Sequence, residues 1–482
     1  MTIRRRFYVR PPMSTTTQKH PALRIAVPFL CIGAALVAVL LLKAPPAKVA
    51  PVAAAEPQPV RRTVEQILAA LPAPKLDSAS GKAFAASLAE VRKKPANDVA
   101  WVTVGDFLAQ MQRDSADPQY YDAAELAYQH ALELNPQSTA AMTGMAWVTG
   151  GRHTFDQSIK WAEQALALNA GNAAALGILG DAEVELGDYD KAFEHYQSMM
   201  DARPDLSSWS RGAHLLWLTG NKSKAMWLME RALKAGAPFA ENTAWCRAEL
   251  AMMQFHDGAL VPAAQVLDPA LAASSRNTHV LLAAGQIAAA RQDFAAARRH
   301  YGTVLEAGPN HAALTALGDL SAQEGDAAGA EKYYAQVEAL HAAHVAGAVH
   351  DHMQMAKFYA DHDRKLVEAL RLAEQHKLTR NVLEADTLAW VYFKNGDQPR
   401  AIEAIKRALS RSTQDAEMHF HAGMIAAAAG DRVSAQQHLQ QALSYNPQFS
   451  VLLAPVAVQT LDQLGSTRTA VSAVPEKTAP AP

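Results

Sequence analysis

Residues 415–450 read DAEMHFHAGMIAAAAGDRVSAQQHLQQALSYNPQFS and decide the fold. The stretch holds two short helical patterns joined by a turn at Gly430–Asp431, where a glycine can adopt the positive φ that ends a helix. Pro447 closes the unit, because proline cannot continue a helix. Small and apolar residues mark the sides on which the two helices are expected to meet: Ala422, Gly423, Ala435, Leu439 and Ala442.

The small residue of the first helix recurs along most of the chain at a nearly constant spacing. Such a residue is needed where a neighbouring helix approaches closely. The positions on the first helix are Gly105, Ala146, Gly180, His214, Ala251, Gly285, Gly318, Ala356, Ala389 and Gly423. A second ladder runs in phase on the second helix at Ala124, Ser158, Ala192, Ala225, Ala263, Ala297, Ala330, Ala369, Ala401 and Ala435. His214 in the first ladder and Ser158 in the second are the exceptions to the pattern. Two ladders with one period predict a repeat architecture, whose core grows by stacking.

This layout resembles the tetratricopeptide repeat, a pair of helices that recurs with a period of about 34 residues. The resemblance implies an all-α fold, a right-handed α–α superhelix of about ten repeats, which we place at residues 97–448. The first copy carries seven extra residues between Gln112 and Tyr121, which predict about one additional turn in each of its helices.

An apolar stretch precedes the repeats. Residues 25–42, IAVPFLCIGAALVAVLLL, contain no charge and would form a helix about 27 Å long, close to the thickness of a bilayer core. Six basic residues lie in residues 1–24, so the positive-inside rule predicts a cytoplasmic N-terminus and repeats on the other side of the membrane. The alternative is a signal peptide cleaved near Ala53–Ala55. An uncleaved transmembrane helix is favoured, because the apolar run is longer than that of a signal peptide.

The remaining segments are assigned by composition and periodicity. Residues 43–62 are rich in Pro and Ala and predict a stiff linker. Residues 63–96 predict N-terminal capping helices, residues 449–465 a C-terminal capping helix, and residues 466–482 a disordered tail. Cys31 lies in the apolar run and Cys246 in the repeats, so no disulfide between them is expected.

The charge distribution argues against nucleic acid as a partner. Residues 1–55 hold eight of the 45 basic residues and none of the 47 acidic ones, so the rest of the chain is net acidic by ten charges. Phosphate binding requires clustered Lys and Arg, and the repeats carry no basic stripe.

The sequence contains no catalytic or cofactor motif, such as a Gly-rich phosphate loop, His-Glu-x-x-His, Gly-x-Ser-x-Gly or Cys-x-x-Cys. We therefore expect neither an enzyme nor a cofactor. One histidine group, His341, His344, His350 and His352, is an alternative metal-binding candidate, since His341 and His344 can share a helix face. A polar helix linking two repeats explains the same residues without a metal, and no metal site is predicted.

The expected binding surface is the inner groove, which the first helix of each repeat lines in this family. The mapped positions are apolar and aromatic, with scattered polar residues such as Gln286, Asp319, Lys357 and Asp386. Large aromatic side chains suit a helical or extended peptide with apolar anchors. The predicted partner-binding residues are Trp147, Trp245, Met252, Phe255, Trp390 and Phe393. Packing between neighbouring helices is the competing explanation for each of them.

The N-terminal apolar run, the extended first repeat DPQYYDAAELAYQHALELNP, ENTAWC at 241–246 and FHAGMIAAAAGD at 420–431 resemble bacterial envelope tetratricopeptide proteins. The resemblance implies a single-pass inner-membrane protein with a periplasmic solenoid that binds a protein or peptide partner. A subunit of an envelope assembly, for secretion, polysaccharide export or cytochrome maturation, is the alternative within this class. Metal binding by the histidine group and self-association are the alternatives from other classes.

Overall fold

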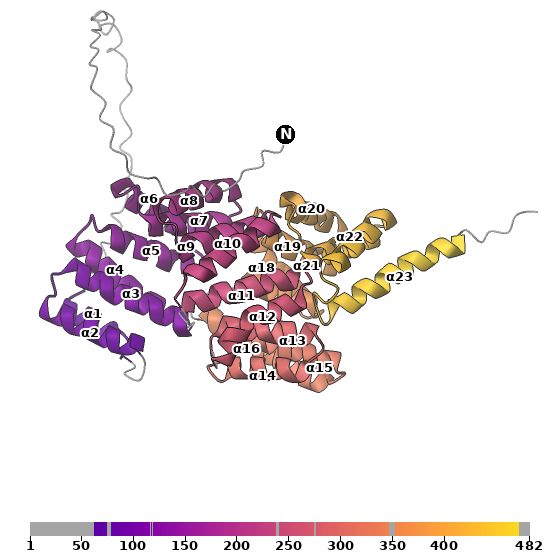
Figure 1. Ribbon diagram of the computed structural model, residues 1–482, viewed down its shortest axis with the longest axis horizontal. Coiled ribbons are helices and arrows are strands. Elements are labelled where there is room, and N and C mark those ends of the chain that lie inside the picture. Colours follow the sequence, from indigo (N-terminus) through magenta and orange to yellow (C-terminus); the bar gives the residue numbers. More distant parts are fainter. Residues whose placement is uncertain are drawn as a thin grey trace, which may run out of the picture. The chain divides into compact units, whose positions relative to one another are not determined.

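The computed structural model describes residues 62–74, 79–115, 117, 119–237, 241–273, 276–346 and 352–471, and these residues contain helices but no strand (Figure 1). The α-helices are α1 (Val64–Ala70), α2 (Ala79–Lys93), α3 (Asp98–Ser115), α4 (Gln119–Leu134), α5 (Thr139–Gly151), α6 (Phe155–Leu168), α7 (Ala173–Glu185), α8 (Tyr189–Ala202), α9 (Leu206–Leu218), α10 (Lys222–Ala235), α11 (Glu241–His256), α12 (Leu260–Ala272), α13 (Thr278–Ala290), α14 (Phe294–Leu305), α15 (His311–Gln323), α16 (Ala327–Ala346), α17 (His352–Asp361), α18 (Leu366–Ala373), α19 (Val382–Lys394), α20 (Gln398–Ala408), α21 (Ala416–Ala428), α22 (Arg432–Tyr445) and α23 (Leu453–Val471). Short 3₁₀ turns follow α18 and α20, at Glu374–His376 and Leu409–Arg411.

Within these residues, α3 to α22 form ten consecutive helix pairs, and neighbouring pairs pack against one another. We call the odd-numbered helix of each pair the A helix and the even-numbered one the B helix. The first pair is long, with 18 residues in α3 and 16 in α4, as the insertion in the first repeat predicts. Helix α2 packs on α3, and α23 packs on α22. Most of α1 belongs to a separate unit of the chain.

Where the ladder residue of an A helix is glycine, it makes room for a side chain of its B helix. At Gly180, an added Cβ would lie 2.3 Å from the ring of Tyr196. The Tyr196 hydroxyl donates a hydrogen bond to Asp181, the next residue along the A helix, at 2.7 Å. The same arrangement recurs in two other repeats, with Gly105, Tyr128 and Asp106, and with Gly318, Tyr334 and Asp319. In these three repeats, the ladder seen in the sequence therefore marks the places where a glycine of the A helix contacts a tyrosine of the B helix.

The A helices begin at side-chain caps that the sequence supplies at regular intervals. Asn172 accepts a hydrogen bond from the backbone N–H of Ala175, which satisfies a donor that the first turn of α7 would leave unpaired. Equivalent caps precede other A helices at Ser138, Asp205, Asn277, Asn310, Asn381 and Asp415. These seven repeats thus carry their own start signal.

Repeats that are far apart in the chain also touch. Asn381 Nδ2, before α19, donates to the carbonyl of Glu185 at 3.2 Å, and Thr413 Oγ1, before α21, donates to the carbonyl of Leu218 at 2.6 Å. Asn446 Nδ2, after α22, donates to the carbonyl of Phe255 at 2.9 Å. Figure 1 shows α19 beside α10. The solenoid therefore winds far enough for one turn of the superhelix to rest on the next.

We call these contacts the inter-turn interface, formed by Gly187, Gly220 and Gly258 on one side and Asn381, Thr413 and Asn446 on the other. The three glycines end A helices with φ between +74° and +79°. Because they carry no side chain, the backbone of the other turn approaches closely. A single hydrophobic core contains buried residues from both turns, among them Leu216, Leu228, Leu388 and Phe420. Burial of apolar surface between the turns adds to the hydrogen bonds.

The predicted transmembrane helix, residues 25–42, lies outside the described residues. Among the helices that the structure does describe, none combines the length and the apolar composition needed to cross a bilayer.

Candidate functional site

The inner faces of the A helices line three hollows of the described solenoid. Two of them, about 490 and 480 Å³ in volume, lie over the first repeats and share the side chain of Trp147 on α5. The third, about 440 Å³, lies among α11, α13, α15, α17 and α21. Volumes of this size can hold a peptide side chain or a small ligand.

We call the first pair of hollows the Trp147 groove, and its walls combine an aromatic ring with arginines. The half-buried indole of Trp147 lies 5.3 Å from the ring of Tyr121, and the Arg113 guanidinium lies 5.6 Å from the indole centre. Arg113 also donates to the neutral side-chain amide of Gln110 at 2.6 Å. Ile178, Met199, Arg203, Arg211 and Glu241 also line the groove.

Arg211 is fixed at the base of this groove by Asp181. Its Nε and Nη2 atoms donate to the two carboxylate oxygens at 2.8 and 2.9 Å, a bidentate pairing. The same carboxylate accepts the hydroxyl of Tyr196, so the pair is tied to the glycine–tyrosine contact beneath it. The groove is therefore a rigid surface with an aromatic ring and positive charge side by side.

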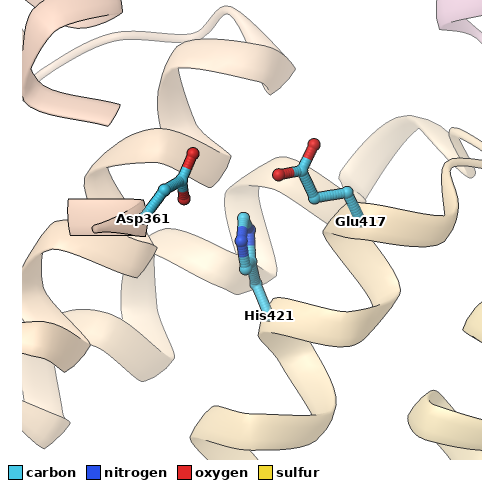
Figure 2. Close-up of side chains that lie close together, drawn as sticks. All are labelled: Asp361, Glu417 and His421. Atoms are coloured by element: carbon cyan, nitrogen blue, oxygen red, sulfur yellow. The ribbon is translucent and has the colours of Figure 1, made fainter. Parts of the chain in front are cut away.

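A cluster of charged side chains lies further along the A helices, on α17, α19 and α21. Lys357 Nζ donates to Asp361 Oδ2 at 2.7 Å and to Glu417 Oε1 at 2.6 Å, and so bridges two helices. His421 Nδ1 contacts both carboxylate oxygens of Asp386 at 3.0 and 3.1 Å. Figure 2 shows His421 between Asp361 and Glu417. We call these five residues the charge cluster.

The pKa values in the cluster reflect its mutual charges. Burial by itself raises the pKa of the Glu417 carboxyl, but the charges of Lys357 and His421 outweigh burial and lower this pKa to about 2. Burial by itself lowers the pKa of Lys357, and the carboxylates of Asp361 and Glu417 reverse that effect and raise it. Burial likewise opposes protonation of His421, but Asp386 raises its pKa overall. The cluster therefore holds opposite charges together.

The 440 Å³ hollow opens beside the charge cluster. Lys357, Asp361 and Glu417 line it together with Gln286 and Asp319. Three of the polar residues mapped to the inner groove from the sequence, Gln286, Asp319 and Lys357, thus come together at one place. Phe449 and Val451, after α22, and Leu453, at the start of α23, also line the hollow.

The six residues predicted to bind a partner are distributed over the solenoid. Trp147 lies in its groove, and Phe255 is 1% exposed but contributes to the wall of the 440 Å³ hollow. Trp390 is 2% exposed and stacks between Phe393 and His421, at centroid distances of 5.0 and 4.3 Å. Trp245, Met252 and Phe393 are half-buried. As partner-binding residues, all six stay predictions. Of the two that line a hollow, Trp147 is half-buried and Phe255 is fully buried.

The candidate histidine group is only partly covered by the structure. His341 and His344 lie on α16 and His352 begins α17, while His350 lies outside the described residues. Among the described residues, the group whose ligand atoms come together is instead Asp361, Glu417 and His421.

Sequence reasoning missed this group, although a signal for it exists. Glu417 and His421 are four residues apart on α21, and Lys357 and Asp361 are four apart on α17, so each pair shares a helix face.

The fold and the inner groove define an α-solenoid of helix pairs. The model of the tetratricopeptide repeat family matches residues 145–207, 282–344 and 387–449, in phase with the helix pairs of the structure. The resemblance drawn from the two ladders is confirmed: the chain contains tetratricopeptide repeats in these three segments.

Comparison with individual proteins gives more distant similarities. A curated relative, the formate-dependent nitrite reductase complex subunit NrfG of Escherichia coli O157:H7, is 28% identical over 115 residues, which are 23% of this chain. The matched region spans about half, 54%, of that relative's length. PilF of Pseudomonas aeruginosa is 19% identical with a TM-score of 0.33, over 44% of this chain and 92% of that one. PilW, a type IV pilus biogenesis factor, is 17% identical with a TM-score of 0.36, over 42% and 93%.

Proposed function

We propose that this protein is a non-enzymatic scaffold that binds a protein partner through the Trp147 groove, on the extracytoplasmic side of a bacterial inner membrane. Tetratricopeptide-repeat proteins generally act as scaffolds for other proteins. The curated relative is by name a subunit of a complex, which supports a role in an assembly. We propose that this assembly belongs to the bacterial envelope and serves secretion, polysaccharide export or cytochrome maturation.

The observation that carries this proposal is the composition of the Trp147 groove. Trp and Arg are the residues that most often dominate the binding energy of protein interfaces. In this groove an indole ring lies beside Arg113, and the fixed guanidinium of Arg211 lines the same hollow. A partner segment with an apolar side chain next to a carboxylate matches both features, because the ring supplies contact area and the arginines supply charge.

We expect Trp147→Ser to weaken partner binding at least about 30-fold, which corresponds to about 2 kcal/mol for a central interface residue. The full chain in detergent, carrying an affinity tag, is used to capture partners from envelope extract. The affinity of the recovered partner is then measured for both proteins. Circular dichroism establishes that the variant is folded.

The matched control is Trp227→Ser. Trp227 is 43% exposed on α10, a B helix, and lines none of the three hollows. This variant should keep the affinity of the parent. Equal affinity of the parent and the Trp147 variant would show that the groove is not the binding site.

The location is tested separately. If residues 25–42 anchor the chain with its N-terminus in the cytoplasm, protease added to intact spheroplasts should degrade the repeats. Repeats that survive until the membrane is permeabilised would contradict the extracytoplasmic location. Retention of the intact chain in the membrane fraction distinguishes the anchor from a cleaved signal peptide.

A further inference from the structure

Three residues of the charge cluster have the chemistry of metal ligands and lie at ligand distance from one another. One ring nitrogen of His421 and one carboxylate oxygen each of Asp361 and Glu417 all lie within 4.8 Å of one another. Glu417 and His421 project from successive turns of α21, and Asp361 ends α17 on the opposite side (Figure 2). Two rigid helices therefore hold the three ligand atoms around a common point.

His421 supplies an independent sign that something binds at this point. Its side chain is fully buried, and only one of its two nitrogens is used: Nδ1 contacts Asp386, whereas Nε2 has no hydrogen-bond partner. Asp361 Oδ1 is also buried without a partner. A buried polar atom without a partner is costly, so each of these atoms calls for an occupant.

The contact between Asp386 and His421 is the support that metal-binding histidines commonly have. A carboxylate that accepts the N–H of one ring nitrogen fixes the tautomer and leaves the other nitrogen with a lone pair for a cation. In the neutral form of His421, with the proton on Nδ1 toward Asp386, the lone pair of Nε2 is directed away from that carboxylate. A bound cation takes the place of the proton that the charged form carries on Nε2.

We propose that Asp361, Glu417 and His421 bind a divalent cation of the zinc class, which replaces the ammonium group of Lys357 between the two carboxylates. One imidazole and two carboxylates are a donor set that zinc accepts, with a water molecule as fourth ligand. The proposal goes beyond the scaffold function and does not depend on it.

Lys357 explains how the same site can exist with and without the cation. Its ammonium group bridges Asp361 and Glu417 and supplies one positive charge at the place where a divalent cation would supply two. The side chain is 33% exposed and lines the 440 Å³ hollow, so it has room to turn out of the cluster. Lysine and cation therefore compete for the two carboxylates.

The test is a calorimetric titration of zinc into the full chain in detergent, after treatment with a chelator and its removal. The parent should bind one zinc ion that Glu417→Gln weakens at least tenfold, since this nearly isosteric change removes a charged ligand. Lys357→Met should bind zinc at least tenfold more tightly, because the competing ammonium is gone. Circular dichroism is recorded for each variant to establish that it is folded.

A second histidine pair provides the control. His419 Nδ1 and His438 Nδ1 lie 3.0 Å apart, outside the proposed ligand set, and could take up zinc on their own. His438→Gln should leave the tight site unchanged. The proposal is overturned if the parent binds no zinc, if Glu417→Gln binds it as tightly as the parent, if only Lys357→Met binds it, or if His438→Gln abolishes the binding.

Discussion

Gly187→Ala should lower the unfolding free energy by about 3 kcal/mol, because it has two costs at the inter-turn interface: an unfavourable backbone conformation and a steric clash with the other turn. Gly187 has φ +74°, a conformation that costs an alanine about 1–2 kcal/mol. Its new Cβ would lie 2.2 Å from the carbonyl carbon of Arg380 and 2.5 Å from the backbone N of Asn381. Backbone cannot rotate out of the way as a side chain can, so the two turns must separate. Such overpacking costs a further ~1–3 kcal/mol.

The control for this variant is Gly396→Ala, which measures the cost of placing an alanine at positive φ without a steric clash. Gly396 ends an A helix with φ +77°, and an added Cβ would meet nothing within 4 Å. Urea denaturation followed by circular dichroism should show a loss of about 1–2 kcal/mol for Gly396→Ala and a clearly larger one for Gly187→Ala. Equal losses would mean that contact between the turns contributes little to stability.

Lys357→Met should lower the unfolding free energy by about 2–3 kcal/mol in the absence of added metal. Removing one partner of a buried ion pair leaves the other charge uncompensated, which costs ~3–5 kcal/mol when burial is complete. The side chains of Lys357 and Glu417 are each 33% exposed, so solvent reduces that cost. The matched control is Lys365→Met. Lys365 is 53% exposed and pairs with Glu338 at 2.7 Å, so its loss should cost less than about 1 kcal/mol.

The pH dependence of the unfolding free energy tests whether the charge cluster causes the stability loss of Lys357→Met. The pKa of Glu417 is lowered from its usual 4.5 to about 2 in the folded protein, so the pair stabilises the fold fully above pH 4.5. As pH falls from 4.5 toward 2, Glu417 becomes protonated and this contribution is lost. The difference between the parent and Lys357→Met should therefore shrink over that window. A difference that stays constant down to pH 2 would assign the effect to packing of the lysine side chain.

Much of the solenoid could be predicted because its packing is local. Gly180 meets Tyr196 on the very next helix, and the cap at Asn172 acts on Ala175 within the first turn of α7. Contacts this short repeat with the period of the chain and leave the same residue types at the same spacing. The same period predicted that Gln286, Asp319 and Lys357 face the inner groove.

The candidate sites were predictable only in part. Trp147, Phe255 and Trp390 occupy equivalent kinds of position in the sequence pattern, yet Trp147 lines an open groove while Trp390 is stacked between Phe393 and His421. The exposure of an aromatic ring depends on which neighbours cover it. Asp361 and Glu417 come together although they belong to different repeats, and their approach is set by the packing of α17, α19 and α21.

The sequence by itself determined the repeat, its period, the helix pairs and the small residues at which they pack, because each of these depends on contacts within one repeat or with the next. Only the tertiary structure decided that Asn381, Thr413 and Asn446 bond to a turn more than 190 residues away. It also decided that Asp361, Glu417 and His421 surround one point. The pitch of a superhelix is the sum of small rotations between successive repeats, and no single repeat encodes that sum.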